Sequence, residues 1–193
     1  TMDRPQPRPA AEAAAGYRLV RQRIDTLLRG RAEVAELVVP ACPSWTVRQT
    51  VSHLCGVAQD LIAGNIQGAG TEPWTWAQVL RLAERKLNDL LNLWAEKTDE
   101  VTALLPRGSD LAANQLVFDA LTHEHDLRGA LGEPAAAPAQ LALQLSGFEA
   151  PRALGGRRLV SQILSLPWRG DATALLAMFM EKAVHPPEVD LIE

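Results

Sequence analysis

Apolar residues recur at intervals of three and four along much of this chain, the spacing of one face of an α-helix. The first such segment covers residues 17–37. The second covers residues 47–63, where Thr46 and Gln49 have the spacing of a capping box and Gly64 provides a stop signal. The pattern therefore predicts two helices in the first third of the chain.

Two further segments keep the same spacing. One predicts a long helix over residues 76–105, ended by Pro106. The other predicts a helix over residues 111–131, ended by Gly132, and its apolar residues lie on more than one side, as in a buried helix. No strand-like alternation lasts long enough for a sheet. We therefore expect an all-α fold, a four-helix bundle with a short, mainly helical C-terminal extension.

The pattern also divides the chain into three parts. Residues 1–15 are rich in Pro, Ala and Arg without a continuous apolar run, which predicts a disordered N-terminal arm rather than a signal peptide. Residues 16–132 form the predicted bundle. Residues 133–193, where the periodicity weakens, form the extension, with candidate short helices and room for one or two short strands within residues 157–166.

Composition narrows the class of protein. A formal net charge of −4 argues against a general nucleic-acid binder. No apolar run approaches the ~18 residues that a membrane span needs. The two cysteines, Cys42 and Cys55, have no CxxC partner and do not make a disulfide framework. We expect a cytoplasmic protein, a monomer or homodimer, that acts on small molecules.

The candidate chemistry lies in the last predicted helix of the bundle. Asp119 and His123 are four residues apart and share a mostly apolar helical face with Asp126, so they need a metal, a polar network or water. His53, at the edge of the second helix's apolar stripe, can complete a three-ligand site with one open position, as in catalytic metal sites. Asp126 is then a candidate second-shell partner that fixes the His123 imidazole. His125 points nearly the opposite way.

Simpler interpretations stay open at this point. Asp119 and His123 can be an ordinary i,i+4 pair worth a few tenths of a kcal/mol, and His53 can be a helix histidine hydrogen-bonded to a neighbour. Cys55 is expected to be a small buried apolar residue rather than a nucleophile.

The sequence offers few candidate substrate-binding residues. Trp74 and Trp76 lie beside a glycine-rich loop, and Trp76 is the candidate wall of a pocket. Arg157 and Arg158 are ordinary surface charges or a clamp for a substrate carboxylate. No catalytic residue is assigned from the sequence.

Two blocks of sequence resemble a known family. Residues 43–54, extended by Cys42, resemble the first signature of the mycothiol-dependent maleylpyruvate isomerase family, with Ser44 where glycine is usual. The acidic residue, histidine and aspartate of residues 119–126 resemble its second signature. Residues 122–132, with shorter matches within 148–158, resemble one branch of the family.

The resemblance implies a DinB-like four-helix bundle that binds a divalent metal at one end, with His53, Asp119 and His123 as ligands. The isomerase has glutamate at the position of Asp119 and a sterol-carrier-like domain after the bundle, where this chain has a short segment. Zinc is the expected ion, and manganese or nickel also suits carboxylate ligation.

The implied function is a mycothiol-dependent enzyme of the S-transferase or cis–trans isomerase type, in which the ion favours the thiolate of its cosubstrate for attack on a small electrophile. Two rival functions are a noncatalytic metal-binding bundle, such as a stress or regulatory module, and a metal enzyme that uses another thiol or water.

Overall fold

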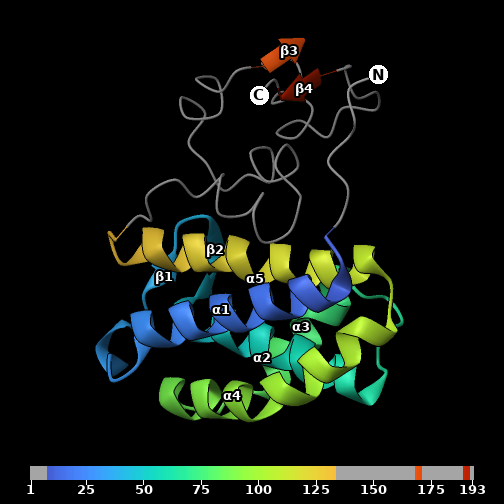
Figure 1. The fold of residues 1–193 in the computed structure, drawn as a ribbon. Helices are drawn as coiled ribbons and strands as arrows, with labels where there is room; N and C mark the ends of the chain where they lie inside the picture. Colours follow the sequence, from blue (N-terminus) through green and yellow to red (C-terminus); the bar gives the residue numbers. More distant parts are fainter. Residues whose placement is uncertain (1–7, 134–167, 171–188, 192–193) are drawn as a thin grey trace.

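The computed structural model describes residues 8–133, 168–170 and 189–191 of the chain. These residues are mainly helical, as predicted, and include five α-helices (Figure 1). The helices are α1 Ala10–Leu28, α2 Val47–Ala63, α3 Glu72–Arg81, α4 Leu87–Leu104 and α5 Asp110–Ala130. None of the described helices is long and apolar enough to cross a membrane.

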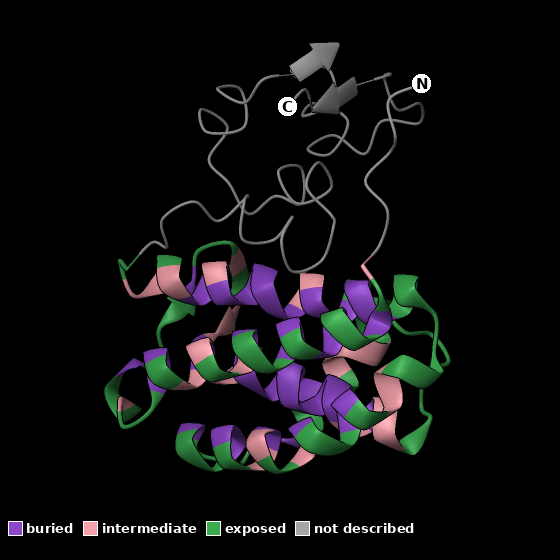
Figure 2. Ribbon diagram, in the orientation of Figure 1, coloured by how far each residue is buried: buried purple, intermediate pink, exposed green. Residues whose placement is uncertain are grey.

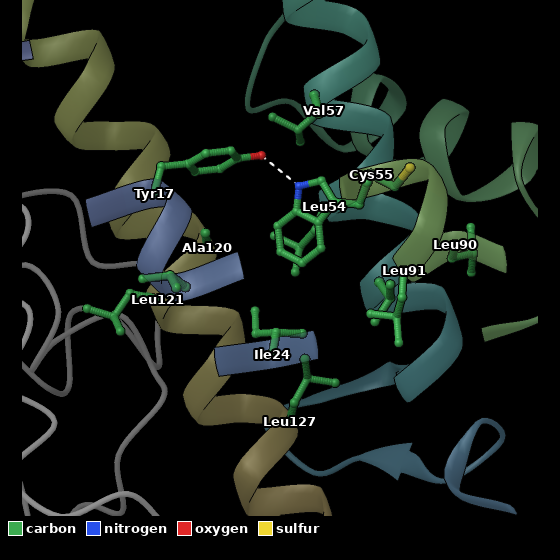
Figure 3. Packing of buried hydrophobic residues seen from close by; sticks show 14 of the residues in the cluster. Tyr17, Ile24, Leu54, Cys55, Val57, Leu90, Leu91, Ala120, Leu121 and Leu127 are labelled. Carbon is green, nitrogen blue, oxygen red and sulfur yellow. Dashed lines mark hydrogen bonds between the residues drawn. The ribbon is translucent and has the colours of Figure 1, made fainter. Parts of the chain in front are cut away.

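The four long helices pack around one hydrophobic core. Helix α1 packs on α4 and α5, while α2 packs on α4 and α5 and carries α3 on another side. Figure 2 shows buried residues concentrated along α2 and α5, whereas α4 has an exposed outer face. At the centre the Trp94 indole N–H donates to the Tyr17 hydroxyl at 2.7 Å (Figure 3). Packed in the same core are Ile24, Leu54, Leu90, Leu91, Leu121 and Leu127.

Helices α2 and α5 confirm their predictions. The Thr46 hydroxyl accepts from the Gln49 backbone N–H at 3.3 Å, and the Gln49 side-chain oxygen accepts from the Thr46 N–H at 2.9 Å. Gly64 ends α2 in the left-handed region, with a φ of 71°. Helix α5 begins and ends within about a residue of its predicted bounds, which is the usual uncertainty of a helix end. These two helices position every predicted metal ligand.

Helix α1 differs from its prediction at both ends. It begins at Ala10, so the predicted disordered arm is wrong for residues 10–15; residues 1–7 lie outside the described residues. Alanine is the strongest helix former, and the Ala10 N–H donates to the Asp110 carboxylate at 2.8 Å, which ties this end to α5. The helix ends at Leu28 rather than at residue 37, because the chain turns at Gly30 with a φ of 77°.

The predicted long helix over residues 76–105 is wrong, because the chain forms two helices there. Helix α3 begins earlier, at Glu72, and α4 begins at Leu87. The break allows Leu82 and Leu87 both to be buried. It also frees the Ala83 carbonyl, which accepts a hydrogen bond from the Arg48 guanidinium. The Ala83 carbonyl thus keeps a hydrogen-bond partner although the helix ends there.

Short strands complete the described chain. Strands β1, Val38–Val39, and β2, Cys42–Thr46, form an antiparallel pair that the pattern did not predict. Strands β3, Trp168–Gly170, and β4, Val189–Leu191, form a second antiparallel pair in the region predicted to be mainly helical. The short helices predicted between residues 133 and 193 lie outside the described residues.

Candidate metal centre

The structure brings the three predicted ligands together between α2 and α5. Nε2 of His53 lies 3.4 Å from one oxygen of the Asp119 carboxylate. Nε2 of His123 lies 3.6 Å from the other oxygen. The two imidazole rings meet edge to face, with centroids 5.1 Å apart. Two histidines from different helices therefore present the same nitrogen to one carboxylate.

These separations suit ligands of one ion. In a tetrahedral site with bonds of about 2.1 Å, neighbouring ligand atoms are roughly 3.4 Å apart. Direct hydrogen bonds between nitrogen and oxygen are shorter, at about 2.9 Å. Both histidines are buried, while the Asp119 side chain is 38% exposed. The nitrogen and oxygen donors, close together and open on one side, fit a divalent ion with a free coordination position.

The second nitrogen of His53 faces a residue that the sequence did not single out. Nδ1 of His53 lies 2.7 Å from the side-chain oxygen of Gln78 on α3. The Gln78 amide nitrogen donates to Asp60 at 2.8 Å. A metal-binding histidine usually gives its other ring N–H to such an acceptor. Gln78 thus occupies the outer position behind His53.

The second nitrogen of His123 faces Asp126, as the i,i+3 spacing predicted. Its Nδ1 lies 3.1 Å from the Asp126 carboxylate, and both side chains are buried. The Cys42 thiol of β2 lies 3.9 Å from the same carboxylate oxygen. Cys42, His123 and Asp126 form a second group of potential ligand atoms, adjacent to the first and sharing His123. His125 belongs to neither group.

Trp45 covers both histidines. Its ring stacks on His123 with centroids 5.9 Å apart and lies against His53 at 5.2 Å. Trp45 immediately precedes the capping box, so the start of α2 is fixed next to the ring. Trp76 packs edge-on against Trp45 at 6.3 Å. The aromatic layer limits how each imidazole can rotate.

A cavity of about 880 Å³ opens beside the ligands. His53, Asp119 and His123 form one side, with Cys42 and Trp45 next to them. Much of the remaining wall is apolar. It includes Val57, Leu61, Ile66, Trp74, Leu104 and Leu116. A small molecule in this space would lie against the open side of the metal centre.

The structure places the predicted substrate-binding residues differently from the expectation. Trp74, rather than Trp76, lines the cavity, and Trp76 packs edge-on against Trp45. This follows from helical geometry, because residues two apart point in very different directions. Arg157 and Arg158 lie outside the described residues.

The two cysteines have different surroundings. Cys55 is fully buried, and this burial raises the pKa of its thiol to about 12. At neutral pH it is protonated and unreactive, in agreement with the expectation of a small apolar residue. Cys42 is partly exposed and lines the cavity.

The residues that sequence reasoning missed are Gln78 and Asp60. A usable signal was Gly56, which is inside α2, where glycine costs about 1 kcal/mol relative to alanine. A Cβ at Gly56 would lie 2.4 Å from Gln78 Cβ, so the glycine permits the close approach of α3. An interior helix glycine one turn from a candidate ligand thus marked the contact.

No family model matches this chain, and no curated protein or solved structure matches it.

Proposed function

We propose that this chain is a divalent-metal-dependent and thiol-dependent enzyme of the S-transferase or cis–trans isomerase type. We further propose that its four long helices form a DinB-like bundle, as in the mycothiol-dependent maleylpyruvate isomerase family. The partners are then a small-molecule thiol, mycothiol, and a small electrophile, and the cell compartment is the cytoplasm. Zinc is the proposed ion, because the site combines imidazole and carboxylate ligands with an open position.

One observation carries the proposal. Two histidine nitrogens and a carboxylate converge at the wall of a cavity large enough for a small molecule. A purely structural metal site would be closed by a fourth protein ligand. Here the Asp119 side chain is partly exposed and lines the cavity, so an exogenous ligand would have access to the same point.

Each residue of the site then has a distinct role in the proposed mechanism. His53, Asp119 and His123 would hold a divalent ion, which when bound would lower the pKa of a thiol that reaches it and so supply a nucleophile at neutral pH. Trp45 and the apolar wall exclude water from one side of the thiol. The Asp126 carboxylate, 3.1 Å from His123 Nδ1, would restrict the movement of that ring. The cavity orients the electrophile beside the thiol, which converts an encounter into an intramolecular step.

Cobalt substitution tests the proposal. Sulfur ligation to cobalt changes its visible absorption, so mycothiol added to the cobalt-loaded protein should shift the spectrum. The His123→Ala variant, loaded under the same conditions, should show no shift, whereas His125→Ala should behave as the wild type. Thiol consumption is then measured against a panel of activated alkenes and other electrophiles.

An unchanged spectrum together with no thiol consumption would contradict the enzyme proposal. If the protein still binds one ion per chain, the result favours the noncatalytic metal-binding bundle. A spectral shift with a different thiol but not with mycothiol would keep the chemistry and change the cosubstrate.

A further inference from the structure

A buried chain of hydrogen bonds extends from His53 away from the cavity. The Gln78 side-chain oxygen lies 2.7 Å from His53 Nδ1, and its nitrogen donates to Asp60 Oδ2. The other oxygen of Asp60 accepts from Arg81 at 3.0 Å and from Asn65 at 3.1 Å. Gln78 is completely buried and Asp60 nearly so. The chain links α2 to α3 behind the metal centre.

The direction of these hydrogen bonds follows from the chemistry of Asp60. An ionised carboxylate only accepts, so Gln78 must turn its NH₂ group toward it. The amide oxygen then faces His53, and Nδ1 of the imidazole must carry the proton. In a neutral imidazole the other nitrogen, Nε2, then has the lone pair. Nε2 is the atom that faces Asp119 at 3.4 Å.

We propose that Gln78, oriented by Asp60, is a positioning residue that fixes the tautomer and ring orientation of His53 as a metal ligand. This inference rests on the proposed metal centre. It assigns a role to two residues outside the set of ligands. Arg81 and Asn65 contribute by holding the charged form of Asp60 in place, since a buried carboxylate needs such donors.

The packing of α3 serves the same contact. Gly56 lacks the Cβ that would meet Gln78 Cβ at 2.4 Å, and the Gly56 carbonyl accepts from Arg81 at 3.3 Å. A buried amide without partners would be costly. All the polar groups of Gln78 that face α2 are used in the chain to His53 and Asp60. The close approach of the helices therefore supports a specific polar contact and not only apolar packing.

The sharpest test is Asp60→Asn, which changes a single atom. The two donors Arg81 and Asn65 hold the amide oxygen of the new residue where Oδ1 was. Its NH₂ group then faces Gln78, which must turn its own oxygen toward it and its NH₂ toward His53. Nδ1 of His53 becomes an acceptor, and the proton moves to Nε2. The substitution thus inverts the tautomer of a histidine that it does not touch.

The tautomer is measured by ¹⁵N NMR of the imidazole in metal-free protein at mildly alkaline pH, where the ring is neutral. The wild type should show a protonated Nδ1, and Asp60→Asn a protonated Nε2. Affinity for zinc, measured in parallel, should fall by roughly 10- to 100-fold, the usual effect of an outer-partner change. A protonated Nδ1 in Asp60→Asn with unchanged zinc affinity would overturn the proposal.

Gln78→Met is the second variant, because it keeps the side-chain length and removes both polar atoms. It should give a mixture of tautomers and a similar loss of zinc affinity. Gln59→Met is its matched control, since Gln59 is on α2 next to Asp60 but makes no described contact with His53; it should change neither readout. If both Asp60→Asn and Gln78→Met leave the His53 tautomer as in the wild type, Gln78 has only a packing role.

The NMR readout needs no metal, so the two proposals fail separately. A wild type that binds no divalent ion would overturn the proposed function. The tautomer comparison would still decide whether Gln78 and Asp60 set the state of His53.

Discussion

Helix α5 carries two clusters of charged side chains about one turn apart, and they differ in their partners. Glu124 is fully buried, and both its oxygens accept from Arg23 Nε at 2.9 Å while Arg128 donates at 2.7 Å. Asp119 is partly exposed to the cavity and faces two histidines at 3.4 and 3.6 Å. The first carboxylate is neutralised by short bonds to two arginines. The second is held at distances that suit an ion between the groups.

The difference shows how one helix serves two purposes. The Glu124 cluster joins α5 to α1 and supports the fold, because its charges are matched within the protein. The Asp119 cluster joins α5 to α2 through groups whose spacing suits a divalent cation. We therefore expect mutations in the first cluster to change stability and mutations in the second to change metal binding.

The largest effect is expected for His123→Ala. It removes a ligand and the contact to Asp126, so affinity for the ion should fall by more than the roughly 100-fold that loss of an outer partner costs. Metal content of the purified protein and a zinc titration measure this. His125→Ala is the matched control and should retain about one ion per chain. Equal metal content in both variants would contradict the assignment of the ligand.

Arg23→Ala tests the structural cluster. It removes the residue that contacts both oxygens of Glu124 and leaves this buried carboxylate with Arg128 alone. The free energy of unfolding should fall by about 3 kcal/mol, because an incompletely paired buried charge is costly. Urea denaturation measures the change, and zinc affinity should stay as in the wild type. A loss of zinc affinity without a loss of stability would show that Arg23 supports the metal centre rather than the fold.

Arg128→Ala should have a smaller effect of about 1 kcal/mol. It removes one hydrogen bond to Glu124 near the end of α5, while the Arg23 contacts remain. The same urea experiment gives the difference between the two arginine variants. If Arg128→Ala is the more destabilising, the Arg23 contacts are not the main support of Glu124.

Asp119→Asn should have the smallest effect on the metal-free protein, within about 0.5 kcal/mol, because the side chain is partly exposed. Zinc affinity should nevertheless fall clearly, since a charged ligand becomes a neutral amide. The comparison of apo stability with zinc titration separates the two effects. A large loss of apo stability would place Asp119 with Glu124 as a structural residue.

Much of the fold followed from local rules. The capping box at Thr46, the stop at Gly64 and the apolar periodicity were enough to locate α2 and α5, since each depends on neighbours in sequence. At the break between α3 and α4, the Ala83 carbonyl accepts a hydrogen bond from Arg48, a residue of another helix. Periodicity could not show it, because the apolar spacing continues through the break.

The residues of the candidate site divide in the same way, into those that local sequence spacing indicates and those that only the fold brings together. Asp119 and His123 were paired by their spacing on one helix, and His53 lies opposite them in the structure. Gln78 and Asp60 are 18 residues apart on two helices, and a buried glutamine has no distinctive local pattern. Trp74 and Trp76 both flank the glycine-rich loop, and only the rotation of α3 shows that Trp74 lines the cavity rather than the predicted Trp76.

Helix α3 contacts both the cavity and the candidate metal centre, and so it connects the two. Trp74 on α3 lines the cavity and donates to the Asn65 carbonyl, while Gln78 on the same helix holds His53. A molecule bound against Trp74 would therefore contact the same helix that supports the proposed ligand His53. If binding in the cavity changed the affinity of the proposed centre for its ion, thermodynamic linkage would require the ion to change cavity binding by the same factor.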